Sequence, residues 1–147
     1  MSLKQTGFTL LEVMVAVLVL GIGLLGMAHL QITSLKHNQS AQFRSSASVM
    51  AADMLDRMRA NRPAAQNGNY ALALDTDPPN NPNDMADIDI ADWLNNLNAE
   101  LPNGDGQIAC DAFDADAAFV CDITISWTEI QDNDDLATTS FLYSGAI

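Results

Sequence analysis

The chain has 147 residues, a length that suits one domain of ordinary size, and its 19 acidic and 6 basic residues give a formal net charge of −13. All six basic residues lie at or before Arg62, whereas the part from Pro63 to Ile147 carries sixteen acidic residues and no Lys or Arg. This acidic part repels nucleic acid, so we predict that it binds none; it can attract cations or a basic partner, or simply serve as a solvated surface.

The N-terminal part contains a segment that is apolar enough to cross a membrane. Residues 8–28 include only two polar side chains, those of Thr9 and Glu12. As a helix they would span about 32 Å, enough for the hydrocarbon core of a bilayer. The carboxylate of Glu12 would cost about 2.5–3.5 kcal/mol in hydrocarbon. We therefore expect that something compensates this charge, or that the segment has a second role outside the bilayer.

Composition alone leaves two interpretations of this segment open. An ordinary secretory signal would place Gly26 and Ala28 at positions −3 and −1 of a cleavage site, although the apolar run is longer than a typical signal core. An uncleaved anchor fits the length, but Lys4 on one side and Lys36 on the other leave its orientation undecided.

A third interpretation comes from the motif at the start of the segment. Gly7-Phe8-Thr-Leu-Leu-Glu12, at the head of an apolar helix, resembles the class III signal of type IV pilins and their relatives. The resemblance implies that a prepilin peptidase removes residues 1–7 as a leader, cutting after Gly7, and methylates the new terminal amine of Phe8. It also implies that Glu12 pairs with the N-terminal ammonium of an adjacent subunit, so that two charges expensive in hydrocarbon become tolerable together.

Helical spacing continues well beyond the apolar segment. Asp53 and Arg57 form an acid-first i,i+4 pair, and Pro63 disfavours helical geometry at the residue before it. The pattern therefore predicts one helix over residues 8–61, with residues 8–28 as its transmembrane and filament-core part. Its later apolar stripe is expected to belong to the core of the head: Ile32, Leu35, Phe43, Ala47, Met50, Ala51, Met54, Leu55 and Met58.

The remaining residues, 62–147, are predicted to form an acidic globular head, which makes the whole chain a pilin-like α+β protein. Residues 63–87 are expected to be irregular, and residues 90–101 show helical spacing with Asp87 or Asp89 as the cap. Alternating apolar and polar residues predict a short antiparallel sheet. Its strands are expected at residues 107–111, 119–128 and 138–144. A turn is expected at residues 133–135, between the last two strands.

Cys110 and Cys121 are the only cysteines of the chain. A close pair in a small domain beyond a membrane segment predicts a disulfide, formed in an oxidising compartment, whereas two buried free thiols are the alternative. In the chain-entropy model such a bridge would stabilise the head by about 2–3 kcal/mol.

The head offers little for catalysis. Both histidines, His29 and His37, lie on the N-terminal helix, so the head lacks His, Lys and Arg from Pro63 onward. A Ser–His–Asp or Cys–His nucleophile, a lysine Schiff base and an arginine clamp are therefore excluded from it. We predict that the chain is not an enzyme and uses no cofactor.

Two acidic clusters raise the question of calcium. They comprise Asp111, Asp114 and Asp116, and then Asp132, Asp134 and Asp135. Both offer hard oxygen ligands, but neither matches the twelve-residue frame of an EF-hand. Solvated acidic turns without a metal are the preferred interpretation.

Residues 7–62 resemble one group of type IV pilins more closely. The runs from Glu12 to Ala28 and from Asp53 to Arg62 are similar to the PilV class of minor pilins, also called type IV pilus modification proteins. This resemblance implies a low-abundance subunit, held in the inner membrane with its head in the periplasm and later in the filament or at its tip. Its partners would be the prepilin peptidase, other minor pilins and the major pilin, in a complex that primes assembly and supports twitching motility and adhesion.

Two alternatives stay open, one of them from another class of protein. A type II secretion pseudopilin shares the leader and the helix, and only the segment from Arg57 to Arg62 favours the pilus over it. A membrane-anchored acidic protein that binds ions, or an anchored enzyme, would share neither the processing nor the methylation. The first residue of the mature chain distinguishes these interpretations. A pilin or pseudopilin would begin at methylated Phe8, a chain with an ordinary secretory signal at His29, and a plain membrane anchor at Met1.

Overall fold

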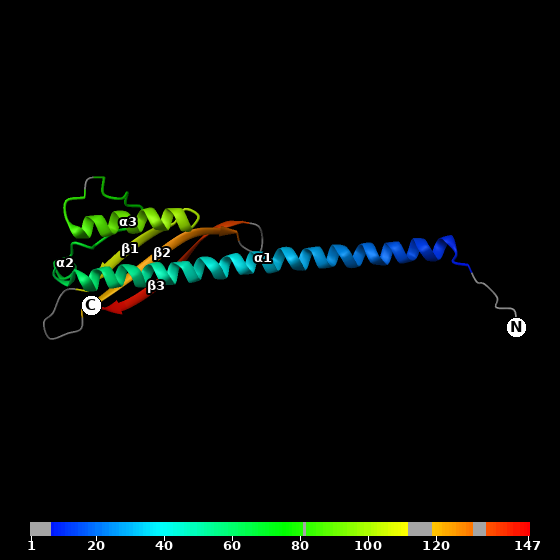
Figure 1. Ribbon diagram of the computed structural model, residues 1–147, viewed down its shortest axis with the longest axis horizontal. Helices are drawn as coiled ribbons and strands as arrows, with labels where there is room; N and C mark the ends of the chain where they lie inside the picture. The colour runs from blue at the N-terminus through cyan, green and yellow to red at the C-terminus, as the bar shows by residue number, and fades with distance from the viewer. Residues whose placement is uncertain (1–6, 81, 112–118, 131–134) are drawn as a thin grey trace. The chain divides into compact units, whose positions relative to one another are not determined.

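A computed structural model describes residues 7–80, 82–111, 119–130 and 135–147 (Figure 1). The chain divides into two compact units, Met1–Gln39 and Ser40–Ile147, and helix α1 (Leu10–Ala60) contributes to both. The second unit also contains α2 (Arg62–Gln66), α3 (Met85–Glu100) and the strands β1 (Asp105–Cys110), β2 (Val120–Ile130) and β3 (Leu136–Ala146).

The long helix confirms the sequence-based prediction to within two residues at each end. It begins at Leu10 and ends at Ala60, where Asn61 departs from helical dihedrals with φ −115° and ψ 46°. Pro63 then lies in the first turn of α2, a position where its missing N–H costs no intrahelical bond. The prediction that residues 63–87 are irregular is therefore wrong at both of its ends, since α2 occupies the first and α3 the last.

Helix α3 is capped by a residue other than the two expected. Asp84 has extended dihedrals, and its side chain accepts a hydrogen bond from the backbone N–H of Asp87 at 3.0 Å. Asp87 in turn accepts from the backbone N–H of Asn83 at 3.0 Å, so it supports the cap from inside the first turn. Asp89 is buried and has a different role, described below. The helix ends at Glu100 because Leu101, which precedes Pro102, is extended.

The three predicted strands are confirmed, and they form one antiparallel sheet in the order β1-β2-β3. Strands β2 and β3 are longer than predicted, with eleven residues each in continuous register from Val120↔Ala146 to Ile130↔Leu136. Of the predicted turn, Asn133 and Asp134 lie outside the described residues.

Both α1 and α3 cover the same face of the sheet (Figure 1). A Cβ added at Gly145 of β3 would lie 2.2 Å from Leu55 of α1, and one added at Gly106 of β1 would lie 2.3 Å from the ring of Trp93 of α3. An added side chain at Gly106 would meet the rigid Trp93 ring, which favours glycine there, whereas at Gly145 the end of the Leu55 side chain would have to shift. The alternating burial of β2 agrees with this arrangement, because Cys121, Ile123, Ile125 and Trp127 point to the helices.

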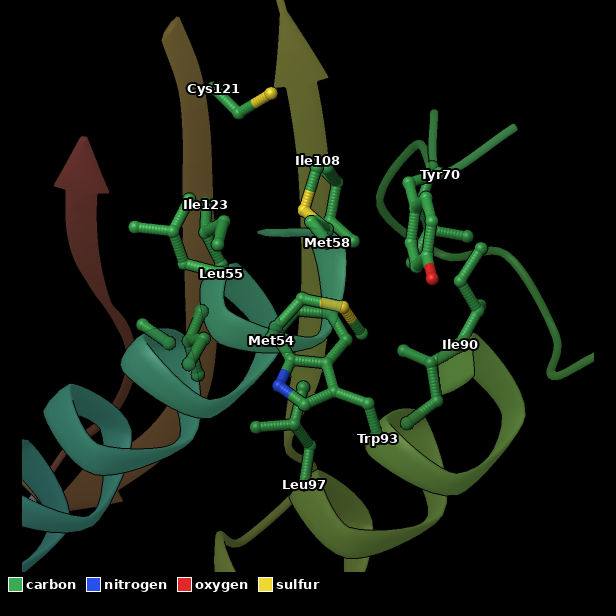
Figure 2. Packing of buried hydrophobic residues seen from close by; sticks show 14 of the residues in the cluster. Met54, Leu55, Met58, Tyr70, Ile90, Trp93, Leu97, Ile108, Cys121 and Ile123 are labelled. Atoms are coloured by element: carbon green, nitrogen blue, oxygen red, sulfur yellow. The ribbon is translucent and has the colours of Figure 1, made fainter. Parts of the chain in front are cut away.

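The core of the second unit lies between the helices and the sheet (Figure 2). Trp93 stands beside Met54 at its centre, and the indole N–H donates to the backbone carbonyl of Met50 at 3.0 Å. From the predicted stripe of α1, five residues are fully buried here and two are partly buried: Ala47, Ala51, Met54, Leu55 and Met58, then Phe43 and Met50. Ile32 and Leu35 belong to the first unit and are exposed there, so the prediction that they join this core is wrong.

A long, partly apolar N-terminal helix, a small three-stranded antiparallel sheet and a disulfide between Cys110 and Cys121 are the elements of a pilin-like α+β fold.

Candidate functional site

The peptide bond between Gly7 and Phe8 lies just ahead of the first residue of α1. Both residues are exposed and non-helical, with 83% of the Phe8 surface accessible. No atom lies within 4 Å of a Cβ built at Gly7. The bond between these two residues is therefore accessible and lies outside the helix.

Thr9 and Glu12 shape the start of the helix. The hydroxyl of Thr9 and its carbonyl both accept from the backbone N–H of Glu12, at 3.2 and 3.1 Å. Thr9 is thus the N-cap, and Glu12 occupies the third helical position, where a carboxylate faces the unpaired amide donors and the positive end of the helix dipole. Thr followed three residues later by Glu is the sequence signature of a capping box, and it marks this helix start.

The first unit presents apolar side chains in all directions around α1. Among the described residues, this helix is the one long and apolar enough to cross a membrane, with a mean hydropathy of 2.5 over its most apolar window and no part of that window buried. Large side chains such as Val13, Leu18 and Leu25 have more than half of their surface exposed. Such an apolar surface needs lipid or other protein surfaces around it.

The disulfide predicted from the two cysteines is confirmed. Cys110 and Cys121 lie directly opposite each other in the pairing of β1 with β2, with an S–S distance of 2.01 Å. Cys121 is fully buried against the core, and its sulfur points toward β1 in Figure 2. The bridge therefore fastens two neighbouring strands at the end of β1.

A buried polar cluster joins α1 to α3. The hydroxyl of Tyr70 donates to Asp89 at 2.6 Å and accepts from the side-chain amide of Asn61 at 3.2 Å. Arg57 donates to Asp89 at 3.2 Å and to Asp53 at 2.8 Å, which confirms the predicted i,i+4 pair. Burial raises the pKa of Tyr70 to about 12, and the bond to Asp89 adds to this. Burial opposes a charge on Arg57, but the two carboxylates outweigh it and raise its pKa.

Polar contacts near both ends of β3 hold this strand in place. Arg59 donates to the carbonyl of Ala146 through Nε at 3.1 Å and through Nη2 at 2.9 Å. Near the other end of the strand, Glu129 accepts from the hydroxyl of Thr139 at 2.7 Å and from the indole N–H of Trp127 at 3.3 Å. Burial alone would raise the pKa of Glu129, yet these donors, with Ser40 and the charge of Arg44, outweigh it and lower that pKa.

The described residues assemble no metal centre. No group of three or more His, Cys, Asp or Glu side chains among them could hold an ion. Four of the six aspartates considered for calcium, Asp114, Asp116, Asp132 and Asp134, lie outside the described residues. An open cleft of about 330 Å³ lies between the loop at Asp75–Asp77 and the end of α3, and its lining includes no nucleophile paired with a base.

Comparison with known protein families gives one match. Residues 2–28 match the prokaryotic N-terminal methylation motif, so the match covers the residues just ahead of α1 and the apolar first part of α1 and none of the head. No curated protein and no solved structure matches the chain. The motif supports a type IV pilin-like protein, that is, a pilin or a pseudopilin, and with the apolar helix it indicates membrane anchoring.

Proposed function

We propose that this chain is a minor pilin of the type IV pilus, of the PilV class, which joins other minor pilins in the complex that primes filament assembly. The observation that carries the proposal is the exposed Gly7–Phe8 junction directly ahead of a capped helix whose first half is apolar on all sides. A prepilin peptidase would cut this junction and methylate Phe8. The particular class rests on the resemblance of residues 7–62.

The position of Glu12 supports an assembly role rather than simple anchoring. After cleavage, the new ammonium of Phe8 would lie four residues before Glu12, at the same end of the helix. A copy of this end placed beside a neighbouring subunit would bring an ammonium and a carboxylate together in an apolar environment, where each is costly alone. The pairing would fix the axial register between subunits, while the apolar surface of residues 8–28 provides the contact area.

The head has the properties of a compact periplasmic module. The disulfide between Cys110 and Cys121 requires an oxidising compartment, which agrees with a head exported across the inner membrane. The acidic surface keeps the head soluble, and a filament or tip location then follows from incorporation of α1 into the pilus.

The mature N-terminus provides the direct test. Native protein purified from membranes is digested with a protease, and the mass of its N-terminal peptide is measured by mass spectrometry. We expect a chain that begins at methylated Phe8, and we expect Gly7→Ala to retain residues 1–7. A native chain that begins at His29 or keeps Met1 would refute the proposal.

A second experiment separates the pilus from type II secretion, because both systems process the same signal. Deletion of the gene for this chain should reduce surface pili and twitching and leave the export of secreted enzymes unchanged. Loss of enzyme export with normal pili would instead assign the chain to the secretion pseudopilins.

A further inference from the structure

Strand β3 forms one edge of the sheet, and the direction of its backbone groups follows from the register. The backbone N–H of Ile147 donates to the carbonyl of Phe119 at 2.9 Å, so the odd-numbered residues of β3 bond to β2. Arg59 bonds to the carbonyl of Ala146, which shows that the even-numbered residues point away from β2. The outward-pointing backbone groups are therefore those of Leu136, Thr138, Ser140, Leu142 and Ser144.

The two edges of the sheet are treated differently. On the β1 edge, Leu72 exchanges two backbone hydrogen bonds with Ile108, at 3.0 and 2.9 Å, so part of that edge is covered. On the β3 edge, Arg59 covers only the end at Ala146. Within the described part of the chain, no backbone–backbone hydrogen bond joins another segment to the outward backbone groups of Leu136, Thr138, Ser140, Leu142 or Ser144.

Strand β3 also lacks the features that normally prevent pairing. Its eleven residues, LATTSFLYSGA, contain no charge and no proline. Exposed apolar side chains also lie along this edge. Leu136 and Leu142 of β3, and Ile130 of β2, which pairs with Leu136, each have more than half of their surface exposed. Such a strand is a template for one more strand, which would gain main-chain hydrogen bonds and apolar contacts on alternate residues.

Charge indicates which kind of strand fits. Asp122 flanks the edge on the exposed face, where it accepts a hydrogen bond from Ser144, and Glu129 flanks it on the helix side through Thr139. A second copy of the compact unit Ser40–Ile147 would bring eighteen acidic residues against four arginines, so the two copies would repel each other overall. Self-pairing at this edge is therefore opposed by like charge, whereas a segment with Lys or Arg would be attracted.

We propose that the free edge of β3 is a strand-addition site that binds an extended, basic segment of a partner protein. The site extends from Leu136 to Ser144, and recognition uses the outward backbone groups of alternate residues. It does not depend on how residues 1–28 are processed or packed.

The test uses the full chain in detergent, labelled for amide exchange by nuclear magnetic resonance, and a capped nine-residue peptide that alternates Val and Lys as the probe. We expect the peptide to slow exchange of the outward amides of Thr138, Ser140 and Leu142 at least about tenfold, because each gains a main-chain acceptor. The inward amides of Thr139 and Phe141 bond to β2 already, so their exchange should not change. This alternation distinguishes strand addition from general stabilisation.

Two control peptides separate backbone pairing from charge. The same Val–Lys peptide with N-methyl groups on alternate backbone nitrogens keeps its charge but loses its donors on one edge, and it should bind at least about tenfold more weakly. A Val–Glu peptide should not protect the edge. Equal binding of the N-methylated peptide, or no protection by the Val–Lys peptide, would overturn the proposal. Protection of the same amides in concentrated protein without peptide would also overturn it, because the edge would then bind a second copy of this chain.

A matched pair of variants tests the position of the site. Ser140→Pro removes an outward N–H, which proline can do on an edge strand without breaking a bond to β2, and it should weaken peptide binding at least about tenfold. Ser140→Thr keeps the N–H and should bind as the native chain does. If Ser140→Pro disturbs folding, amide exchange in the native chain still tests the proposal, through the comparison of the Val–Lys peptide with its N-methylated form.

Discussion

The hydroxyl of Tyr70 donates a hydrogen bond to the carboxylate of Asp89 at 2.6 Å, and this bond connects the chain after α2 to the first turns of α3. Tyr70 is fully buried and Asp89 nearly so, and Arg57 of α1 approaches the same carboxylate at 3.2 Å. Three segments that are distant in sequence thus meet at one carboxylate. Breaking this cluster should loosen the position of α3 against α1.

Tyr70→Phe should lower the free energy of unfolding by about 1–3 kcal/mol, because it leaves a buried carboxylate with one donor fewer. Urea unfolding of the full chain in detergent, followed by Trp fluorescence, measures this, since both tryptophans are buried in the head. Tyr143→Phe is the control, as Tyr143 is the other tyrosine of the chain and is only partly buried. Equal losses in the two variants would contradict a special role for the Asp89 contact.

The same cluster predicts a pH dependence at the alkaline end. The pKa of Tyr70 is raised from 10 to about 12 in the folded chain, so the folded state keeps a proton that the unfolded state loses. The corresponding stabilisation is fully present below pH 10 and declines as the pH rises toward 12. In a Tyr143→Phe background, the ultraviolet absorbance of tyrosinate should appear near pH 12 in the folded chain. Asp89→Asn should lower that pKa, and titration of Tyr70 near pH 10 in the folded Tyr143→Phe chain would show that the cluster is absent.

The elements of the fold were largely predictable, because each rests on a local pattern. The apolar run and the stripe around Met54 give the helix, and the alternation from Cys121 to Trp127 gives the central strand. The cysteine spacing alone did not reveal that the two residues would face each other across β1 and β2. Helix α2 does not follow from the sequence, because Pro63 fits both the start of irregular chain and the first turn of a helix.

The polar clusters could not be predicted, because their members are brought together only by packing. Asp89 was considered as a helix cap, since the sequence shows an acidic residue near a helix start. Its burial depends on Tyr70 and Arg57, which are 19 and 32 residues away. The free edge of β3 is likewise a property of strand order, which alternation of apolar and polar residues does not specify.

Removing the disulfide by replacing both Cys110 and Cys121 with Ala should lower the free energy of unfolding by about 2–3 kcal/mol, because the unfolded chain regains the freedom of the closed loop. The native chain under a reducing agent should lose a similar amount. The double variant should itself be insensitive to that agent. A native chain with unchanged stability after verified reduction would contradict the prediction.

Gly106→Ala should lower the free energy of unfolding by about 1–3 kcal/mol through overpacking. An added Cβ would lie 2.3 Å from the ring of Trp93, and that ring is held by its bond to the carbonyl of Met50. Trp93→Leu removes the ring, so Gly106→Ala should cost clearly less in a Trp93→Leu background. A double-mutant cycle by urea unfolding measures the difference. Equal costs in both backgrounds would show that the two residues do not press on each other.

Glu12→Ala should leave membrane insertion and leader cleavage intact and strongly reduce incorporation into filaments. The proposed pairing of Glu12 with a neighbouring ammonium is a buried ion pair, and removal of one partner from such a pair costs about 3–5 kcal/mol, or a factor of more than a hundred in association. Thr9→Val is the matched control, because it removes the hydroxyl that caps the helix beside Glu12 but leaves the carboxylate. Immunoblots of membrane and sheared pilus fractions measure the outcome. A Glu12→Ala chain that enters filaments as well as the native chain would contradict the pairing. A Thr9→Val chain that is lost from filaments equally would show that helix capping rather than charge pairing explains the effect.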